Sequence, residues 1–176
     1  MFKPNLLLVR PLAGHTNKIV QKTIDVLSQD FDVVCPDLIH DTYEGYLTEL
    51  RQYLDQYDNI VGICQGGRGL MEASNEGAIK LKNKNIVLIA APIDHTAAPS
   101  IVSKNISAIG VDHMLRMYTL DGEIRGKLLL SSYMLLDLPS HWNKYMEMLL
   151  TGNEKTARFY RMYFDTEDMS REFFRE

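Results

Sequence analysis

The chain has 176 residues, 45% of them hydrophobic and 24% charged, which is ordinary for one globular domain with a buried core. A formal net charge of -4 leaves no basic field to hold a polyphosphate backbone, so we expect no nucleic-acid partner. We expect no signal peptide, because the apolar run at residues 6–9 is too short, and no apolar run is near the roughly 18 residues that span a bilayer. A cytoplasmic protein without a transmembrane segment is therefore expected.

Short β-rich runs alternate with amphipathic stretches in the first half, which predicts βαβ units and a parallel sheet. Runs rich in Val, Ile and Leu predict four strands, at residues 6–10, 31–35, 59–64 and 85–91. Because these runs are apolar without alternation, we expect helices on both faces. Helical spacing predicts the connecting helices at residues 19–27, 46–57 and 69–81.

After Pro92 the sequence changes to helical periodicity without a further strand. Three helices are expected, at residues 128–138, 142–150 and 156–164. Their Met and aromatic residues are typical of a core or of a pocket cover. We divide the chain into a central α/β core with the site, residues 1–95, and a helical lid-like segment, residues 96–176.

The strongest local signal is a buried strand running into Gly62-Ile63-Cys64-Gln65-Gly66 and then into a helix. This is the nucleophile elbow with Cys in place of Ser, a tight turn that needs small residues two positions either side of the nucleophile. The helix dipole would favour the thiolate, and the Gln65 N–H could meet an oxyanion. We predict Cys64 as an acyl-transfer nucleophile; the alternative is a buried, inert thiol.

The segment after the first strand predicts the rest of the site. An α/β-hydrolase builds its second oxyanion donor there, and the N–H of Leu12 or Ala13 is the expected donor. Gly14 would let the backbone approach a substrate carbonyl. We expect Gly14 and His15 to contact substrate, although His15 could instead be a bystander that caps the following helix.

Other chemistries have weaker signals. The stretch Gly66-Gly67-Arg68-Gly69 at a helix N-terminus could bind phosphate, but it matches neither the P-loop pattern nor the dinucleotide-binding pattern. We expect no metal and no cofactor, because paired ligand spacing is missing among His15, His40, His95, His113 and His141. Strands ending at Cys35 and Cys64 should flank the first strand, about 10 Å apart, too far for a disulfide. Cys35 is therefore interpreted as a structural thiol.

Several motifs in one collinear order resemble a known family, the intracellular poly(3-hydroxybutyrate) depolymerases of the α/β-hydrolase superfamily. The motifs are Leu7-Leu8-Val9-Arg10-Pro11-Leu12-Ala13-Gly14-His15, Asp32-Val33-Val34-Cys35-Pro36-Asp37, Val61-Gly62-Ile63-Cys64-Gln65, Ala90-Ala91-Pro92-Ile93-Asp94 and Pro99-Ser100. The helical half, with Met134-Leu135-Leu136-Asp137-Leu138-Pro139 and Phe159-Tyr160, resembles that family's lid-like insertion less specifically. The resemblance implies ester cleavage in a 3-hydroxyalkanoate polymer or oligomer, with Cys64 as nucleophile and the Gln65 amide in the oxyanion hole.

The sequence departs from the family where the triad acid and base belong. Members continue through two further strands that bring the Asp and then the His. Asp94 follows the wrong strand, while His95, His113 and His141 fall in the loop or the lid. We therefore expect a partial α/β-hydrolase fold whose acid and base reside on a missing segment or a second polypeptide. Loss of acid/base help costs about 10²–10⁴ in rate, so the isolated chain should be nearly inactive.

Two other hypotheses stay open. The chain could be a non-catalytic remnant that binds a partner chain or a polymer granule through its Met-rich helices. Alternatively, His95 or His113 replaces the base, which requires an imidazole within hydrogen-bond reach of the Cys64 sulfur. A four-stranded sheet would also leave apolar surface uncovered at its edges.

Overall fold

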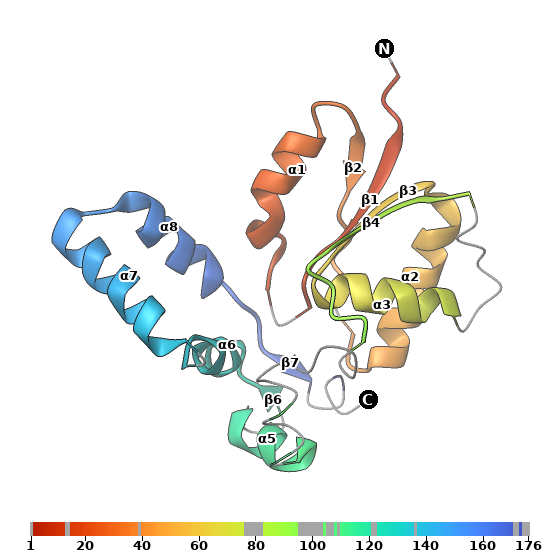
Figure 1. Ribbon diagram of the computed structural model, residues 1–176. Coiled ribbons are helices and arrows are strands. Elements are labelled where there is room, and N and C mark those ends of the chain that lie inside the picture. Colours follow the sequence, from red (N-terminus) through yellow and green to blue (C-terminus); the bar gives the residue numbers. More distant parts are fainter. Residues whose placement is uncertain are drawn as a thin grey trace.

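The first half of the chain forms a sheet of four parallel strands in the order β2-β1-β3-β4 (Figure 1). The strands are β1 (Asn5–Val9), β2 (Asp32–Val34), β3 (Asn59–Ile63) and β4 (Asn85–Ile89). Three lie within their predicted runs and β1 begins one residue earlier than predicted, so the predicted α/β class is confirmed. The structure, a computed structural model, describes residues 2–12, 15–38, 40–75, 83–94, 104, 108, 110–120, 123–135, 137–170 and 173.

β1 lies between β2 and β3, as the sequence predicts. Leu6 is in register with Val33 on one side and with Asn59 on the other. The chain thus leaves β1 toward one side for β2 and reaches β3 on the opposite side. In open parallel sheets such a reversal places a crevice outside the carboxyl ends of the two strands, where ligands bind.

Helices cover both faces of the sheet around β1 (Figure 1). On one face η1 (Asn17–Val20) and α1 (Gln21–Leu27) pack over a cluster that includes Leu6, Leu8, Val20 and Val61. On the other face α2 (Tyr43–Gln56) and α3 (Gln65–Asn75) pack over Leu7, Val9, Leu50, Leu54, Ile60 and Leu70. Alternate residues of β1 therefore enter two different cores, as the two-residue period of a strand requires.

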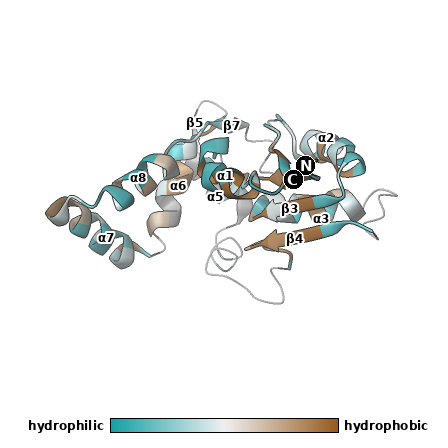
Figure 2. Ribbon diagram, turned by 90° about the horizontal axis from the view of Figure 1, so that it is seen from above, coloured by the Kyte–Doolittle hydropathy of each residue, from teal (hydrophilic) through white to brown (hydrophobic). Residues whose placement is uncertain are grey.

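β4 is an edge strand and is less well covered than the others. Its side chains Val87, Leu88 and Ile89 are 54%, 38% and 43% exposed, and the strand is strongly hydrophobic (Figure 2). The prediction that helices cover every strand on both faces is therefore wrong at β4. The apolar surface predicted at a sheet edge is present there. The predicted helix before β4 is described only as far as Asn75, the last residue of α3.

Helices dominate the second half: α5 (Val111–Tyr118), α6 (Gly126–Leu135), α7 (Leu138–Thr151) and α8 (Glu154–Tyr163). The last three correspond to the three predicted helices. The side chains of Asp137 and Asn153 cap α7 and α8. These two helices form a hairpin that extends away from the sheet (Figure 1). Within the described part of the chain, none of the helices combines the length and hydropathy needed to cross a bilayer.

A second, antiparallel sheet joins β5 (Thr119–Leu120), β6 (Glu123–Ile124) and β7 (Met169–Ser170). The prediction of no strand after Pro92 is therefore wrong. Strands of two residues are too short to produce an alternating pattern that a sequence could reveal.

The chain end returns to the first half through residues 165–170 and 173, here called the C-terminal strap. Asp165 forms an ion pair with Lys18 at 2.7 Å. Phe173 is buried with its ring 5.6 Å from that of Tyr43 and 5.9 Å from that of Tyr46. The strap therefore anchors the helical half to the core. The predicted division near residue 95 stays a prediction, since residues 95–103 lie outside those described.

Candidate active site

Cys64 occupies a strained turn between β3 and α3. Its φ of 53° lies in the left-handed region, which residues other than glycine seldom adopt. Such a conformation costs about 1–3 kcal/mol and persists only where its surroundings impose it. The Cys64 N–H donates to the Ile89 carbonyl at 2.9 Å, and the Cys64 carbonyl accepts from the Gly67 N–H at 3.0 Å. These bonds tie the turn to both β4 and the first turn of α3.

The glycines around Cys64 are required by close packing. A Cβ on Gly62 would lie 2.7 Å from the Cα of Gly67. A Cβ on Gly66 would lie 2.2 Å from the carbonyl oxygen of Arg10. Both neighbours are backbone atoms, which cannot swing away as a side chain can. The start of α3 is therefore in direct contact with the residue that follows β1.

Of the predicted oxyanion donors, Gln65 lies next to this contact. Gln65 is the first residue of α3, so its N–H has no intrahelical partner and lies at the positive end of the helix. Leu12, two residues beyond Arg10, is buried. Ala13 and Gly14 lie outside the described residues, so their roles stay predictions.

His15 lies at the same edge of the sheet in a buried position, 7% exposed. Its ring packs 5.5 Å from that of Tyr163, and its carbonyl accepts a hydrogen bond from the Arg10 guanidinium. Burial, together with the charge of Arg10, lowers the pKa of His15, so its imidazole is neutral at pH 7. Thr16 occupies the cap position of η1, and no side chain caps that helix, so His15 is not the predicted cap.

Arg10 is a site residue that the sequence did not indicate. Its guanidinium is buried and forms an ion pair with the Asp37 carboxylate. A buried charge requires such a partner, and this pair holds the segments that follow β1 and β2 together. The available signal was an Arg at the end of the predicted strand 6–10 and an Asp two residues after the predicted strand 31–35.

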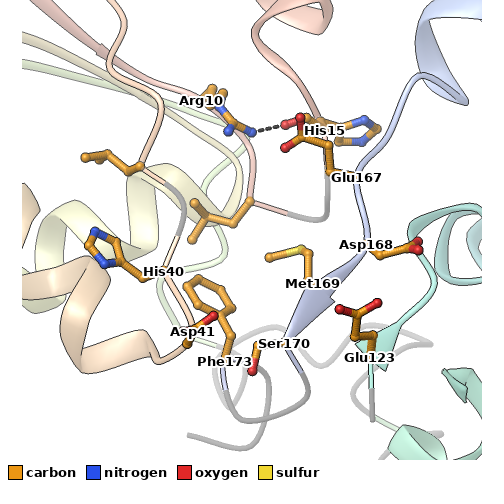
Figure 3. A pocket seen from close by; sticks show the side chains of 12 residues that line it. Arg10, His15, His40, Asp41, Glu123, Glu167, Asp168, Met169, Ser170 and Phe173 are labelled. Atoms are coloured by element: carbon orange, nitrogen blue, oxygen red, sulfur yellow. Dashed lines mark hydrogen bonds between the residues drawn. The ribbon is translucent and has the colours of Figure 1, made fainter. Parts of the chain in front are cut away.

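A cavity of about 300 Å³ lies beside this ion pair (Figure 3). Its walls come from the segments after β1 and before α2, from β6 and from the strap, and include Arg10, His15, His40, Asp41, Met169 and Phe173. The described residues that line it include neither Cys64 nor Gln65. The cavity therefore adjoins the elbow through Arg10 without containing the sulfur.

None of the described histidines hydrogen-bonds to the Cys64 sulfur. His40 pairs with Glu49, and His141 Nδ1 lies 3.2 Å from the Tyr160 hydroxyl. His113 is exposed on α5, whereas His95 lies outside the described residues. Among described side chains, no three His, Cys, Asp or Glu residues converge on a metal-sized site.

Cys35 has a different environment from Cys64, although both are free thiols. Its Sγ donates to the Asn17 Oδ1 at 3.5 Å. Burial raises the pKa of Cys35 to about 11, against a smaller opposing effect of Arg10. It is thus protonated at neutral pH, as a structural thiol should be.

Comparison with protein-family models found no match, and comparisons with curated proteins and with solved structures found none either. The fold and the site define an α/β protein with a strained cysteine at a strand-to-helix turn. Any assignment of function therefore depends on this geometry and on the sequence motifs.

Proposed function

We propose that this chain is an α/β-hydrolase-type thiol esterase in which Cys64 accepts the acyl group. The supporting observation is the positive φ of Cys64 between a parallel strand and a helix. A merely structural cysteine gains nothing from this costly conformation, whereas a nucleophile is thereby presented at the carboxyl edge of the sheet.

In the proposed reaction the Cys64 thiolate attacks the ester carbonyl carbon. The resulting oxyanion is stabilised by the Gln65 N–H and by the positive end of α3. Collapse of the intermediate breaks the bond to the alcohol, which leaves protonated, and forms a thioester on Cys64. Water then releases the acid and restores the thiol. We propose that the proton is taken by His95 or by a group from a second polypeptide.

For the substrate we propose a 3-hydroxyalkanoate polymer or oligomer. The support is the resemblance of residues 7–15 and 61–65 to the depolymerase motifs. The ester groups of such a substrate are neutral, which suits an acidic protein of net charge -4.

The test is hydrolysis of a soluble 3-hydroxybutyrate oligomer by the wild type, by Cys64→Ala and by the matched control Cys35→Ala. We expect slow hydrolysis that Cys64→Ala abolishes and Cys35→Ala retains. Equal rates in the wild type and Cys64→Ala would show that the sulfur takes no part.

A second candidate function, binding to an apolar surface, is supported by the hairpin of α7 and α8. Along α7, Leu138, Trp142, Tyr145 and Leu149 repeat at helical spacing, and all four side chains are exposed. We propose a polymer granule or a partner chain as the binding surface. Sedimentation with polyhydroxybutyrate granules should decrease in Trp142→Ala but not in Glu147→Ala on the same helix; equal sedimentation of both would exclude this surface.

A further inference from the structure

The hairpin of α7 and α8 differs in charge from the rest of the chain. Residues 138–163 hold two acidic side chains and four basic ones, which are Lys144, Lys155, Arg158 and Arg161. The hairpin therefore has a formal charge of +2, whereas the whole chain has a formal charge of -4. A positive segment that extends from a negative protein is attracted to negative surfaces that repel the remainder of the molecule (Figure 1).

One face of α7 is apolar and exposed. Leu138, Trp142, Tyr145 and Leu149 are all exposed, and at about 100° per residue they lie within about 60° of one another around the helix axis. The Trp142 and Tyr145 rings are 6.4 Å apart, as expected for neighbours on one face. Trp and Tyr rings with one apolar and one polar end favour the boundary between lipid headgroups and acyl chains.

A basic residue of α8 lies on the same side of the hairpin as this face. The two helices run antiparallel, and His141 Nδ1 of α7 lies 3.2 Å from the Tyr160 hydroxyl of α8. Around the helix axes, the apolar face follows His141 by about 40–100°, and Arg161 follows Tyr160 by about 100°. Antiparallel helices turn in opposite senses when viewed along one direction, so both rotations lead to the same side of the hairpin.

Two arginines of α8 are available to bind an anion. Arg158 and Arg161 line an open hollow beside η1 together with Lys18, Glu154 and Asp165. Lys18 is paired with Asp165, whereas neither arginine forms an ion pair with a described residue. A guanidinium matches the oxygens of a phosphate group and can donate two parallel hydrogen bonds to them.

We propose that this hairpin binds an anionic lipid surface. The apolar face of α7 enters the boundary between headgroups and acyl chains, and Arg158 and Arg161 contact the lipid phosphates. A neutral polymer would make no use of these charges, which favours lipid as the partner. The inference rests on the second proposed function, because it names the partner of the same face of α7.

The test is sedimentation of the full chain with three surfaces. These are vesicles of phosphatidylcholine and phosphatidylglycerol in equal amounts, vesicles of phosphatidylcholine alone, and lipid-free polyhydroxybutyrate granules. We expect binding to the anionic vesicles that weakens with added salt, and at least about tenfold weaker binding to the neutral vesicles. No binding to anionic vesicles, or equal binding to both kinds, would overturn the inference. Sedimentation with the granules but not with vesicles would overturn it and leave the second function in place.

Variants of equal net charge test the position of the basic groups. Each Lys or Arg near an anionic surface strengthens binding about fivefold, so Arg158→Gln combined with Arg161→Gln should weaken binding to anionic vesicles at least about tenfold. The matched control is Lys22→Gln combined with Lys127→Gln, at exposed positions on α1 and α6, which should change binding less than about twofold. Equal losses in the two double variants would show that only the net charge matters and would overturn the assignment to α8.

Trp142 reports directly on the apolar face, because it is the only Trp of the chain. Its fluorescence emission should shift to shorter wavelength when anionic vesicles are added to the wild type. Lipids brominated in their acyl chains should quench this emission. Binding to vesicles without either change would place α7 outside the bilayer and overturn the inference.

Discussion

Replacing Gly66 with alanine adds a methyl group against the backbone that follows β1. The new Cβ would lie 2.2 Å from the Arg10 carbonyl oxygen and 2.8 Å from that of Val9. Because both contacts are with backbone, the end of β1 and the start of α3 must move apart. Overpacking costs about 1–3 kcal/mol, and we expect the upper end, although alanine gains up to about 1 kcal/mol as a better helix former. A net loss of about 2 kcal/mol follows.

Gly152→Ala is the matched control. Gly152 has φ 65° with nothing within 4 Å of an added Cβ, so this change tests backbone strain without a clash. It should cost about 1 kcal/mol. Urea unfolding followed by circular dichroism gives both free energies. A loss in Gly66→Ala no larger than in Gly152→Ala would refute the close contact between α3 and the end of β1. Gly66→Ala should also slow acylation of Cys64, since the turn moves with the helix.

Three further predictions concern titratable side chains. With a pKa of about 11, Cys35 is only about 0.1% thiolate at pH 8, so iodoacetamide should modify Cys64 before Cys35. The modification rate of Cys35 should then rise about tenfold per pH unit up to about pH 11, and equal rates for the two thiols at pH 8 would contradict this. Folding lowers the pKa of His15, so the unfolded chain takes up a proton at this residue more readily than the folded chain does. The stabilisation that the neutral imidazole provides is therefore complete above the pKa of the unfolded chain, about 6.5, and is lost as the pH falls below that pKa. His15→Gln should therefore flatten the fall in unfolding free energy between about pH 6.5 and 5, and an unchanged slope would argue against a buried neutral imidazole. Tyr46 has a buried hydroxyl without a hydrogen-bond partner among described residues, so Tyr46→Phe should leave stability unchanged or raise it by up to about 1 kcal/mol in thermal unfolding; a loss of about 1 kcal/mol or more would reveal a hidden partner.

The parallel sheet could be predicted because its inner strands are apolar on both faces. Residues 6–9 and 60–61 are uninterrupted aliphatic runs, and all of these side chains are buried. The run at β4 is just as apolar, yet its side chains are exposed. The apolar composition of a run indicates that it forms a strand that can be buried. Whether that strand lies inside the sheet or at its edge depends on the strand order, which composition does not indicate.

The turn at Cys64 could also be predicted, since Gly62 and Gly66 are set by local geometry that a short motif encodes. The wall of the cavity could not. Arg10 pairs with Asp37, and Phe173 packs against Tyr43, across long stretches of sequence. Such contacts depend on the folded arrangement and leave no periodic signal in the chain.

The most direct test of the proposed role of Cys64 is to trap its acyl form. The protein is incubated with p-nitrophenyl butyrate, quenched in acid and examined by intact-mass and peptide mass spectrometry, alongside Cys64→Ala and Cys35→Ala. We predict one butyryl group on Cys64, present in Cys35→Ala and missing in Cys64→Ala. A wild type that is acylated elsewhere, or not at all while remaining folded, would contradict the assignment of Cys64 as the nucleophile.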